Sequence, residues 1–244
     1  MIFMKALKWL VVALSLAIGL MLIVGINKWN RLPSGQSILS DFEAVAGNGL
    51  KPHISYDDFP LHVRHAIFAA ENSTHHGYGV SWNNCIWRYF SRSNVRELGI
   101  RSFPTSCIDG LSYRAAEEFL SREYSIRPKW PFVHVMLLGW KMEWTLGRQK
   151  VVELILNQSY FGKSAYGFPQ AANAFFNKPL SELSISESAT LAGLIAAPAI
   201  LGPNRNPVRS KTRRDKVLKE MLVRGNISTQ TYQSAISETL GSKK

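Results

Sequence analysis

The sequence predicts a mainly α-helical protein in which one N-terminal transmembrane helix precedes a soluble body. Three observations support this fold class: a long uncharged apolar stretch near the N-terminus, apolar residues that recur at helix-face spacing through the body, and few strand-like alternations. The 244 residues suffice for one sizeable domain with a complete core or for two small ones. We expect residues 1–30 to form a membrane anchor, 31–56 a linker and 57–244 the folded domain.

The predicted anchor runs from Trp9 to Ile26 and contains no charged residue. At about 1.5 Å per residue, a helix of this length nearly spans a hydrocarbon layer of about 30 Å. A cleaved signal peptide is the alternative, but the apolar run is long for one and no small-x-small cleavage site follows it. Basic and aromatic residues flank the run on both sides, as at a membrane interface: Lys5, Lys8, Trp9, Lys28, Trp29 and Arg31. The flanking positive charges nearly balance, so they leave the orientation open.

The charge balance restricts the partners of the protein. The chain has 29 Lys and Arg against 17 Asp and Glu, a formal net charge of +12 at pH 7. A surface of this sign attracts polyanions, which include nucleic acid, anionic lipid headgroups and phosphorylated substrates. A membrane anchor favours an anionic membrane as partner and disfavours nucleic acid.

The body begins near Asp57, and its first predicted helix spans residues 59–71. Val63 and Ile67 share one helical face, Pro60 suits the first turn, and Glu71 ends the helix. A carboxylate at this end lies beside the negative pole of the helix dipole, which is unfavourable. A glutamate in such a place favours a functional role over a solvated surface position.

Residues 81–130 are rich in cations and aromatic rings and show no clear helical pattern. Arginine suits phosphate groups and aromatic rings suit sugars, although a solvated basic face beside core aromatics explains any single residue equally well. Cys85 and Cys107 lack zinc-site spacing, and a disulfide between them stays open if the body lies outside the cytoplasm. The cations and rings are Arg88, Arg92, Arg96, Arg101, Arg114, Arg122, Arg127, Lys129, Trp82, Trp87, Tyr89 and Tyr113.

Two helix candidates follow. Residues 132–146 form a strongly apolar one that Gly147 is placed to end. Residues 151–156 are apolar on nearly every side apart from Glu153, so this carboxylate needs a partner inside the protein. Four residues then interrupt the pattern before a further short helix over 170–176: Asn157, Gly162, Gly167 and Pro169.

The C-terminal part is also predicted to be helical. Ser184 and Glu187 form a capping box that opens a helix over 185–197, which is rich in small residues. Residues 204–214 are predicted as a basic loop that lies in solvent or near anionic groups. The loop leads into a helix over 215–224, and a short, partly frayed helix follows.

Several of these residues together resemble the signature blocks of glycosyltransferase family 51, the peptidoglycan glycosyltransferases. The first block is matched by Glu71, Asn72, His75 and Gly77. The fourth block is matched in order by Glu153, Leu156, Asn157, Phe161, Gly162, Gly167, Ala171, Ala172, Phe175, Phe176 and Lys178. The fifth is matched by residues 183–193 with Pro198, Pro203 and Pro207. This agreement in order and spacing is far beyond a chance short motif.

The resemblance implies a lysozyme-like glycosyltransferase 51 domain on the outer, periplasmic face of a bacterial cytoplasmic membrane. Such an enzyme polymerises lipid II, the lipid-linked disaccharide precursor, into glycan strands with inversion. In the family the first-block glutamate is the general base that takes the proton from the acceptor sugar's 4-hydroxyl, so Glu71 is the predicted catalytic residue. The candidate substrate-binding residues are Asn72, His75, Ser102, Thr105, Arg127, Lys129, Lys141, Asn157 and Arg205.

The expected partners are lipid II, the growing glycan strand, an anionic membrane and other cell-wall synthesis proteins. No cofactor is required by this prediction and no side chain is predicted as a metal ligand. Mg²⁺ or Mn²⁺ is an optional aid to the departing diphosphate, beside arginines and lysines.

The chain departs from the family pattern in its middle part. Asn72 stands where the family has Asp, the segment before His75 is shortened, and the paired glutamines of the second block are missing. Val135 occupies the place of the second acid, and Glu143 matches a structural glutamate. Two alternatives therefore stay open. One is a non-catalytic relative that serves as a scaffold or binding partner in cell-wall synthesis, and the other is a lytic, glycan-cleaving enzyme that uses Glu71 alone.

Overall fold

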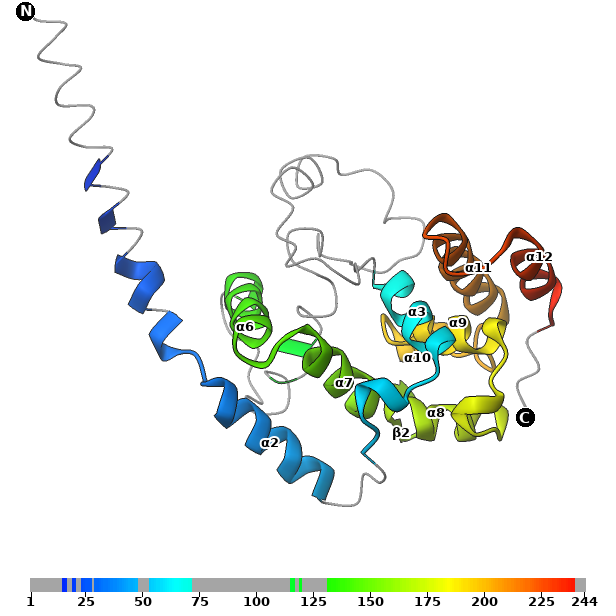
Figure 1. Cartoon of the computed structure of the whole chain (residues 1–244), viewed down its shortest axis with the longest axis horizontal. Helices are drawn as coiled ribbons and strands as arrows, with labels where there is room; N and C mark the ends of the chain where they lie inside the picture. Colours follow the sequence, from blue (N-terminus) through cyan, green and yellow to red (C-terminus); the bar gives the residue numbers. More distant parts are fainter. Residues whose placement is uncertain are drawn as a thin grey trace, which may run out of the picture.

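A computed structural model describes residues 15–16, 19–20, 23–27, 29–47, 53–71, 115–116, 119 and 131–239. Over these residues the protein is mainly helical, as predicted, with one small two-stranded sheet (Figure 1). In chain order the elements are α2 (Gly35–Gly47), η1 (Tyr56–Asp58), α3 (Leu61–Ala70), α6 (Pro131–Leu146), α7 (Arg148–Gln158), β1 (Tyr160–Gly162), β2 (Ala165–Tyr166), α8 (Gly167–Phe176), η4 (Leu180–Glu182), α9 (Ile185–Leu194), α10 (Pro198–Leu201), α11 (Pro207–Val223) and α12 (Thr229–Ser237).

Three helices, α3, α9 and α11, pack against one another and form the core of the domain (Figure 1). α3 contributes buried apolar side chains that include Val63 and Ile67. α9 begins with the predicted capping box, in which Ser184 Oγ accepts from the Glu187 amide at 3.1 Å and the Glu187 carboxylate accepts from the Ser184 amide at 2.8 Å. α9 ends at Leu194, three residues earlier than predicted, and the short α10 follows.

Glu153 of α7 is buried and has the partners that its position demands. Its carboxylate accepts from the Lys150 ammonium at 2.6 Å and from the Tyr56 amide at 3.0 Å, and it lies 2.7 Å from His53 Nε2. Because Tyr56 and His53 precede α3, this one carboxylate joins the start of the domain to α7.

Asn157 does not interrupt α7, contrary to the prediction, because its side chain is satisfied within the fold. Its Nδ2 donates to the Glu153 carbonyl at 2.8 Å and to the Ile54 carbonyl at 2.8 Å, and its Oδ1 accepts from the Ile54 amide at 2.9 Å. The helix continues to Gln158 and ends at the next residue, Ser159. Asn157 was predicted to break the helix, but it instead joins α7 to the segment that precedes α3.

A hairpin of β1 and β2 connects α7 to α8. Its two-residue loop, Lys163-Ser164, has φ angles of 50° and 58°. α8 then begins at Gly167 and includes Pro169, so the predicted interruption at Pro169 is wrong; a proline in the first turn needs no intrahelical donor. Gly167 has a φ of +78°, and a Cβ there would collide with the Asn157 carbonyl group. Only glycine fits at this position.

The predicted basic loop over 204–214 is largely helical, which corrects that prediction. α11 begins at Pro207, and its first turns carry the charged residues that obscured the helical pattern. One of them, Arg214, is wholly buried. Its guanidinium donates to Ser186 Oγ (3.1 Å) and to the carbonyls of Ile236 (3.0 Å) and Glu238 (2.6 Å), so it holds the C-terminal end of α12.

The predicted linker over 31–56 contains a helix, α2, which lies beside α6 (Figure 1). Ile38 of α2 is wholly buried, and this packing stabilises a helix whose Gly- and Ser-rich sequence has low propensity for it. Most of the predicted anchor, residues 9–26, lies outside the described residues. In the part of the chain that the structure describes, every helix is too short or too polar to cross a bilayer.

Candidate active site

Glu71 is positioned by α3, the helix that it was predicted to end. It is the C-terminal cap of that helix, with φ −94° and ψ 9°, and its amide donates to the Ile67 carbonyl at 3.1 Å. Only 8% of the residue is exposed, so the side chain does not face bulk water. The acid therefore has a fixed place on the main chain and a sheltered environment.

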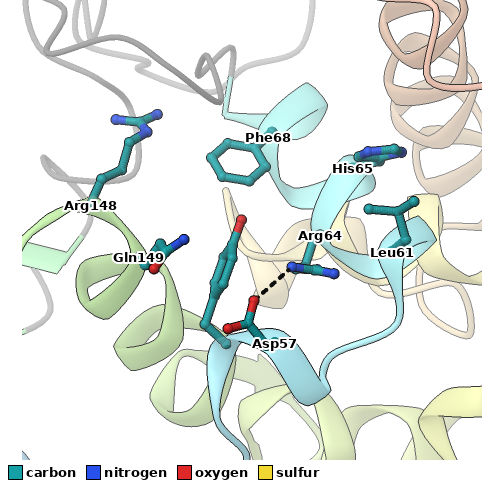
Figure 2. Close-up of a pocket in the computed structure, with 8 residues that line it drawn as sticks. Asp57, Leu61, Arg64, His65, Phe68, Arg148 and Gln149 are labelled. Carbon is teal, nitrogen blue, oxygen red and sulfur yellow. Dashed lines mark hydrogen bonds and ion pairs between the residues drawn. The ribbon is translucent and has the colours of Figure 1, made fainter.

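A cavity of about 530 Å³ lies along the same helix (Figure 2). This volume falls within the range of small-molecule sites, roughly 300–1,000 Å³. Its α3 wall is made by residues at helix-face spacing: Leu61, Arg64, His65 and Phe68. Its other lining residues are Tyr56 and Asp57 from η1 and Arg148 and Gln149 from α7.

Glu71 continues the helix face that lines this cavity, although it is not itself one of the lining residues. It follows Phe68 by three positions and Arg64 by seven, and residues with this spacing lie above one another on a helix. The cavity therefore runs along the side of α3 toward the end that carries the acid.

The charges at the cavity nearly cancel. The Arg64 guanidinium lies 4.9 Å from the centre of the Tyr56 ring and 3.4 Å from a carboxylate oxygen of Asp57. The Arg148 guanidinium lies 5.5 Å from the centre of the Phe68 ring and 2.6 Å from the Glu143 carboxylate. Each cation is thus opposed by an acid and stacked on an aromatic ring.

The histidine at the cavity adds no positive charge near neutral pH. Burial lowers the pKa of His65, and the positive charges of Arg64 and His62 lower it further. Burial also lowers the pKa of His62, although a hydrogen bond with the main chain of Leu183 opposes this. A neutral imidazole both donates and accepts, which suits hydroxyl groups better than phosphate.

Three of the predicted substrate-binding residues can be located, and none lines the cavity. The Lys141 ammonium donates to the carbonyls of Trp29 (3.1 Å) and Leu32 (2.8 Å), where it holds the segment before α2. Asn157 pairs with Ile54, and Arg205 is exposed, with its guanidinium 3.4 Å from the Ala199 carbonyl. Their contact with a substrate remains a prediction.

The other predicted site residues lie outside the described residues: Asn72, His75, Ser102, Thr105, Arg127 and Lys129, together with the pair Cys85 and Cys107. The sequence did not point to Arg64, Arg148 or Tyr56. The available signal was the spacing of Arg64 and Phe68 before Glu71, which places a cation and a ring on the face of the acid. Arg148 had no such signal, because its nearness to α3 depends on the tertiary fold.

Comparison with protein families identifies one matching model, described as Transglycosylase, over residues 40–222. Similar proteins described as penicillin-binding protein 1A occur in several bacteria. The one from Neisseria flavescens is 34% identical over 199 residues, which are 80% of this chain and 24% of that protein. The one from Neisseria lactamica is 31% identical over 238 residues, 92% of this chain and 29% of that protein.

The Aquifex aeolicus protein of the same description is 35% identical over 199 residues, 79% of this chain and 26% of that protein. The chain therefore spans about a quarter of the length of the curated relatives it matches. A crystal structure of penicillin-binding protein 1A from Haemophilus influenzae also matches, with a TM-score of 0.39 and 34% sequence identity, over 54% of this chain and 17% of that one.

Proposed function

This chain belongs to the transglycosylase family, glycosyltransferase family 51, and from this premise we propose that it polymerises lipid II into glycan strands with Glu71 as the general base. The observation that carries the proposal is the burial of Glu71, which is 8% exposed, at the end of α3, a helix whose residues from Leu61 to Phe68 line a cavity. The family match spans α3 and continues through α6, α7, α8 and α9.

In the proposed reaction, the 4-hydroxyl of an incoming precursor attacks the anomeric carbon of the growing strand. A new glycosidic carbon–oxygen bond forms as the bond from that carbon to the lipid diphosphate breaks, with inversion. Glu71 accepts the hydroxyl proton, and the bonding electrons leave with the diphosphate. A base that is held by its own main chain and sheltered from water needs no rearrangement to accept the proton.

We assign a saccharide unit of the substrate to the cavity beside α3, and not the diphosphate. The two guanidinium groups there are each opposed by a carboxylate, so little net positive charge remains for a dianion. Aromatic rings beside Asp, Gln, Arg and neutral His offer the stacking surfaces and planar hydrogen-bonding groups that suit sugar hydroxyls. The diphosphate would then depend on the arginines and lysines predicted between residues 88 and 129.

A divalent cation is not assigned to this chain's own side chains. Over the described residues, no group of three or more His, Cys, Asp or Glu side chains converges that could hold a metal ion. No step of the proposed reaction is therefore routed through Mg²⁺ or Mn²⁺.

We also propose that the N-terminal segment anchors the domain to the outer face of a cytoplasmic membrane. The support is the uncharged run from Trp9 to Ile26 with its basic and aromatic flanks. An anchored enzyme meets a lipid-linked substrate in two dimensions, which raises the effective concentration of each for the other.

The test is glycan polymerisation by the purified full chain in detergent, supplied with labelled lipid II. We expect polymer from the wild type and a loss of about 10²–10⁴ in rate for Glu71→Gln, because the amide cannot accept the proton. Glu182→Gln, which changes an exposed glutamate in η4, is the matched control and should retain the wild-type rate.

The possible outcomes separate the functions. Absence of polymer from a folded wild-type protein would reject the proposal and favour a scaffold. Polymer from Glu71→Gln at the wild-type rate would remove Glu71 as the base. Shortening of finished glycan strands, with no growth from lipid II, would identify a lytic enzyme instead.

A further inference from the structure

Arg213 of α11, which is partly buried, contacts the end of α3. Its Nη2 donates to the carbonyl of Ala70 at 2.8 Å, a bond between residues 143 apart in the chain. Ala70 is the last residue of α3, and Glu71 follows it directly. A guanidinium therefore holds the final helical carbonyl immediately before the proposed base.

This bond supplies a hydrogen-bond donor to the C-terminal end of α3. The last four carbonyls of a helix have no intrahelical donor, and the Glu71 amide itself reaches only back into α3, to the Ile67 carbonyl at 3.1 Å. A cation at this end also interacts favourably with the negative pole of the helix dipole. It thereby opposes the dipole cost of placing the Glu71 carboxylate at the negative pole.

The path of Arg213 requires a glycine. A Cβ at Gly193 of α9 would lie 2.9 Å from Arg213 Cγ, closer than carbon atoms approach without a shift. The arginine side chain thus crosses α9 at the one point where that helix has no side chain in its way. The three core helices, α3, α9 and α11, each contribute one part of the arrangement (Figure 1).

The two neighbouring arginines of α11 have separate tasks. Arg214 holds the end of α12 through the carbonyls of Ile236 and Glu238. Arg213 holds the end of α3 on the other side. Arg214 also donates to Ser186 of α9, and among the described residues it makes no hydrogen bond to the end of α3.

We propose that Arg213 is a positioning residue for Glu71: it fixes the last turn of α3, along the path that Gly193 leaves open, so that the acid has one orientation for proton transfer. It acts through the main chain of Ala70 and needs no contact with substrate. This inference rests on the proposed function of Glu71 as the base.

The first experiment measures polymerisation by Arg213→Ala, Arg213→Lys and Gly193→Ala, each in the full chain with labelled lipid II. We expect kcat to fall about 10–100-fold in Arg213→Ala with little change in KM, because a misplaced base slows chemistry without removing a substrate contact. Arg213→Lys keeps a cationic donor and should recover part of the loss. Arg209→Ala, an exposed arginine one turn earlier on α11, is the matched control and should keep the wild-type kcat.

A double mutant separates positioning from general damage to the core. If Gly193 acts through the arginine, Gly193→Ala lowers kcat in the wild type and has little further effect in Arg213→Ala. Additive losses would show that the alanine disturbs α9 independently, and would overturn the assigned path. If Arg213→Ala does not fold, the kcat values of Arg213→Lys and Gly193→Ala are compared with that of the wild type, and both should be lower.

A readout without turnover distinguishes failure of this inference from failure of the proposed function. Amide hydrogen exchange in the last turn of α3 should speed up in Arg213→Ala and Gly193→Ala, and not in Arg209→Ala. Unchanged exchange with unchanged kcat would overturn the positioning role while leaving the glycosyltransferase intact. If the wild type itself makes no polymer, faster exchange in the variants would still show that Arg213 orders the end of α3, but the proposed function of Glu71, and with it a catalytic role for Arg213, would be rejected.

Discussion

Arg148, at the start of α7, and the buried Glu143, near the end of α6, form an ion pair with 2.6 Å between Nη1 and Oε1. The two side chains face each other across Gly147, whose φ of +79° turns the chain between the helices. Arg148 also lies over the Phe68 ring and lines the cavity beside α3. The junction of α6 and α7 thus sets one wall of the candidate substrate site.

Glu143→Gln should destabilise the protein by up to about 3 kcal/mol, because it removes the charge opposite a guanidinium whose side chain is only 13% exposed. The measurement is the free energy of unfolding from urea titration. Glu220→Gln, which breaks the i,i+4 pair with Arg224 on α11, should cost about 0.3–0.5 kcal/mol. Equal losses of unfolding free energy in the two variants would show that burial does not strengthen the contribution of the Glu143–Arg148 pair.

Arg214→Met should also cost about 3–5 kcal/mol, although methionine fills much of the same space. The change removes the donors to Ser186, Ile236 and Glu238 and leaves these buried or half-buried acceptors without their partner. Limited proteolysis should cut first near α12, since that helix loses its attachment. Arg209→Met, at an exposed position of the same helix, should stay within about 0.5 kcal/mol of the wild type.

The cluster around Glu153 predicts a pH dependence of stability. Burial alone raises the pKa of the Glu153 carboxyl, but the Lys150 ammonium, the His53 ring and the Tyr56 amide together hold it below its ordinary value of 4.5. Because the folded pKa lies below the unfolded one, the contribution to stability is present above the unfolded pKa and is lost as pH falls through the folded pKa.

Urea titrations between pH 7 and about pH 3 should therefore show a steeper loss of stability in the wild type than in Glu153→Gln. The variant should also be less stable at pH 7, where the wild-type carboxylate is ionised and bound. Parallel curves for the two proteins would rule out this cluster as a source of the pH dependence.

Asp57→Ala tests the assignment of a saccharide unit to the cavity. The Asp57 side chain is 84% exposed, so its removal should change the free energy of unfolding by less than about 0.5 kcal/mol. Loss of one hydrogen bond to a sugar hydroxyl should raise KM for lipid II about 3–10-fold with little change in kcat. Asp58→Ala, next to it but not part of the cavity lining, is the control. An unchanged KM and kcat would show that Asp57 does not bind the substrate.

Much of the helical framework could be predicted because it depends on local chemistry. The Ser184–Glu187 capping box, the end of α3 at Glu71 and the turn at Gly147 each follow from residue types at fixed spacing. The demand of Glu153 for a partner was also predictable, since a carboxylate in an apolar helix cannot remain unpaired. Of its partners, Lys150 is local, but His53 and Tyr56 were not predictable, because they lie 100 and 97 residues away.

Apart from Pro169, which is tolerated because it lies in the first turn of α8, the errors come from tertiary packing that overrides local pattern. α2 forms where composition predicts a linker because Ile38 packs into the core. α11 begins at Pro207 because Arg214, read as a loop cation, is buried among acceptors of α9 and α12. The cavity could not be predicted from the sequence, because Arg64 and Arg148 come to line the same space only in the folded protein.

The hydrogen bonds between Asn157 and Ile54 have a mechanical consequence. Two hydrogen bonds to the main chain of Ile54, reinforced by Glu153 on Tyr56, fasten the entering chain to α7 before α3 begins. A pull on the N-terminal segment would be resisted first by the bonds of Lys141 to Trp29 and Leu32 and by the packing of α2 on α6, and then by α7. These attachments to α6 and α7 all precede α3, so movement of the proposed anchor would be taken up before it reached the helix that ends at Glu71.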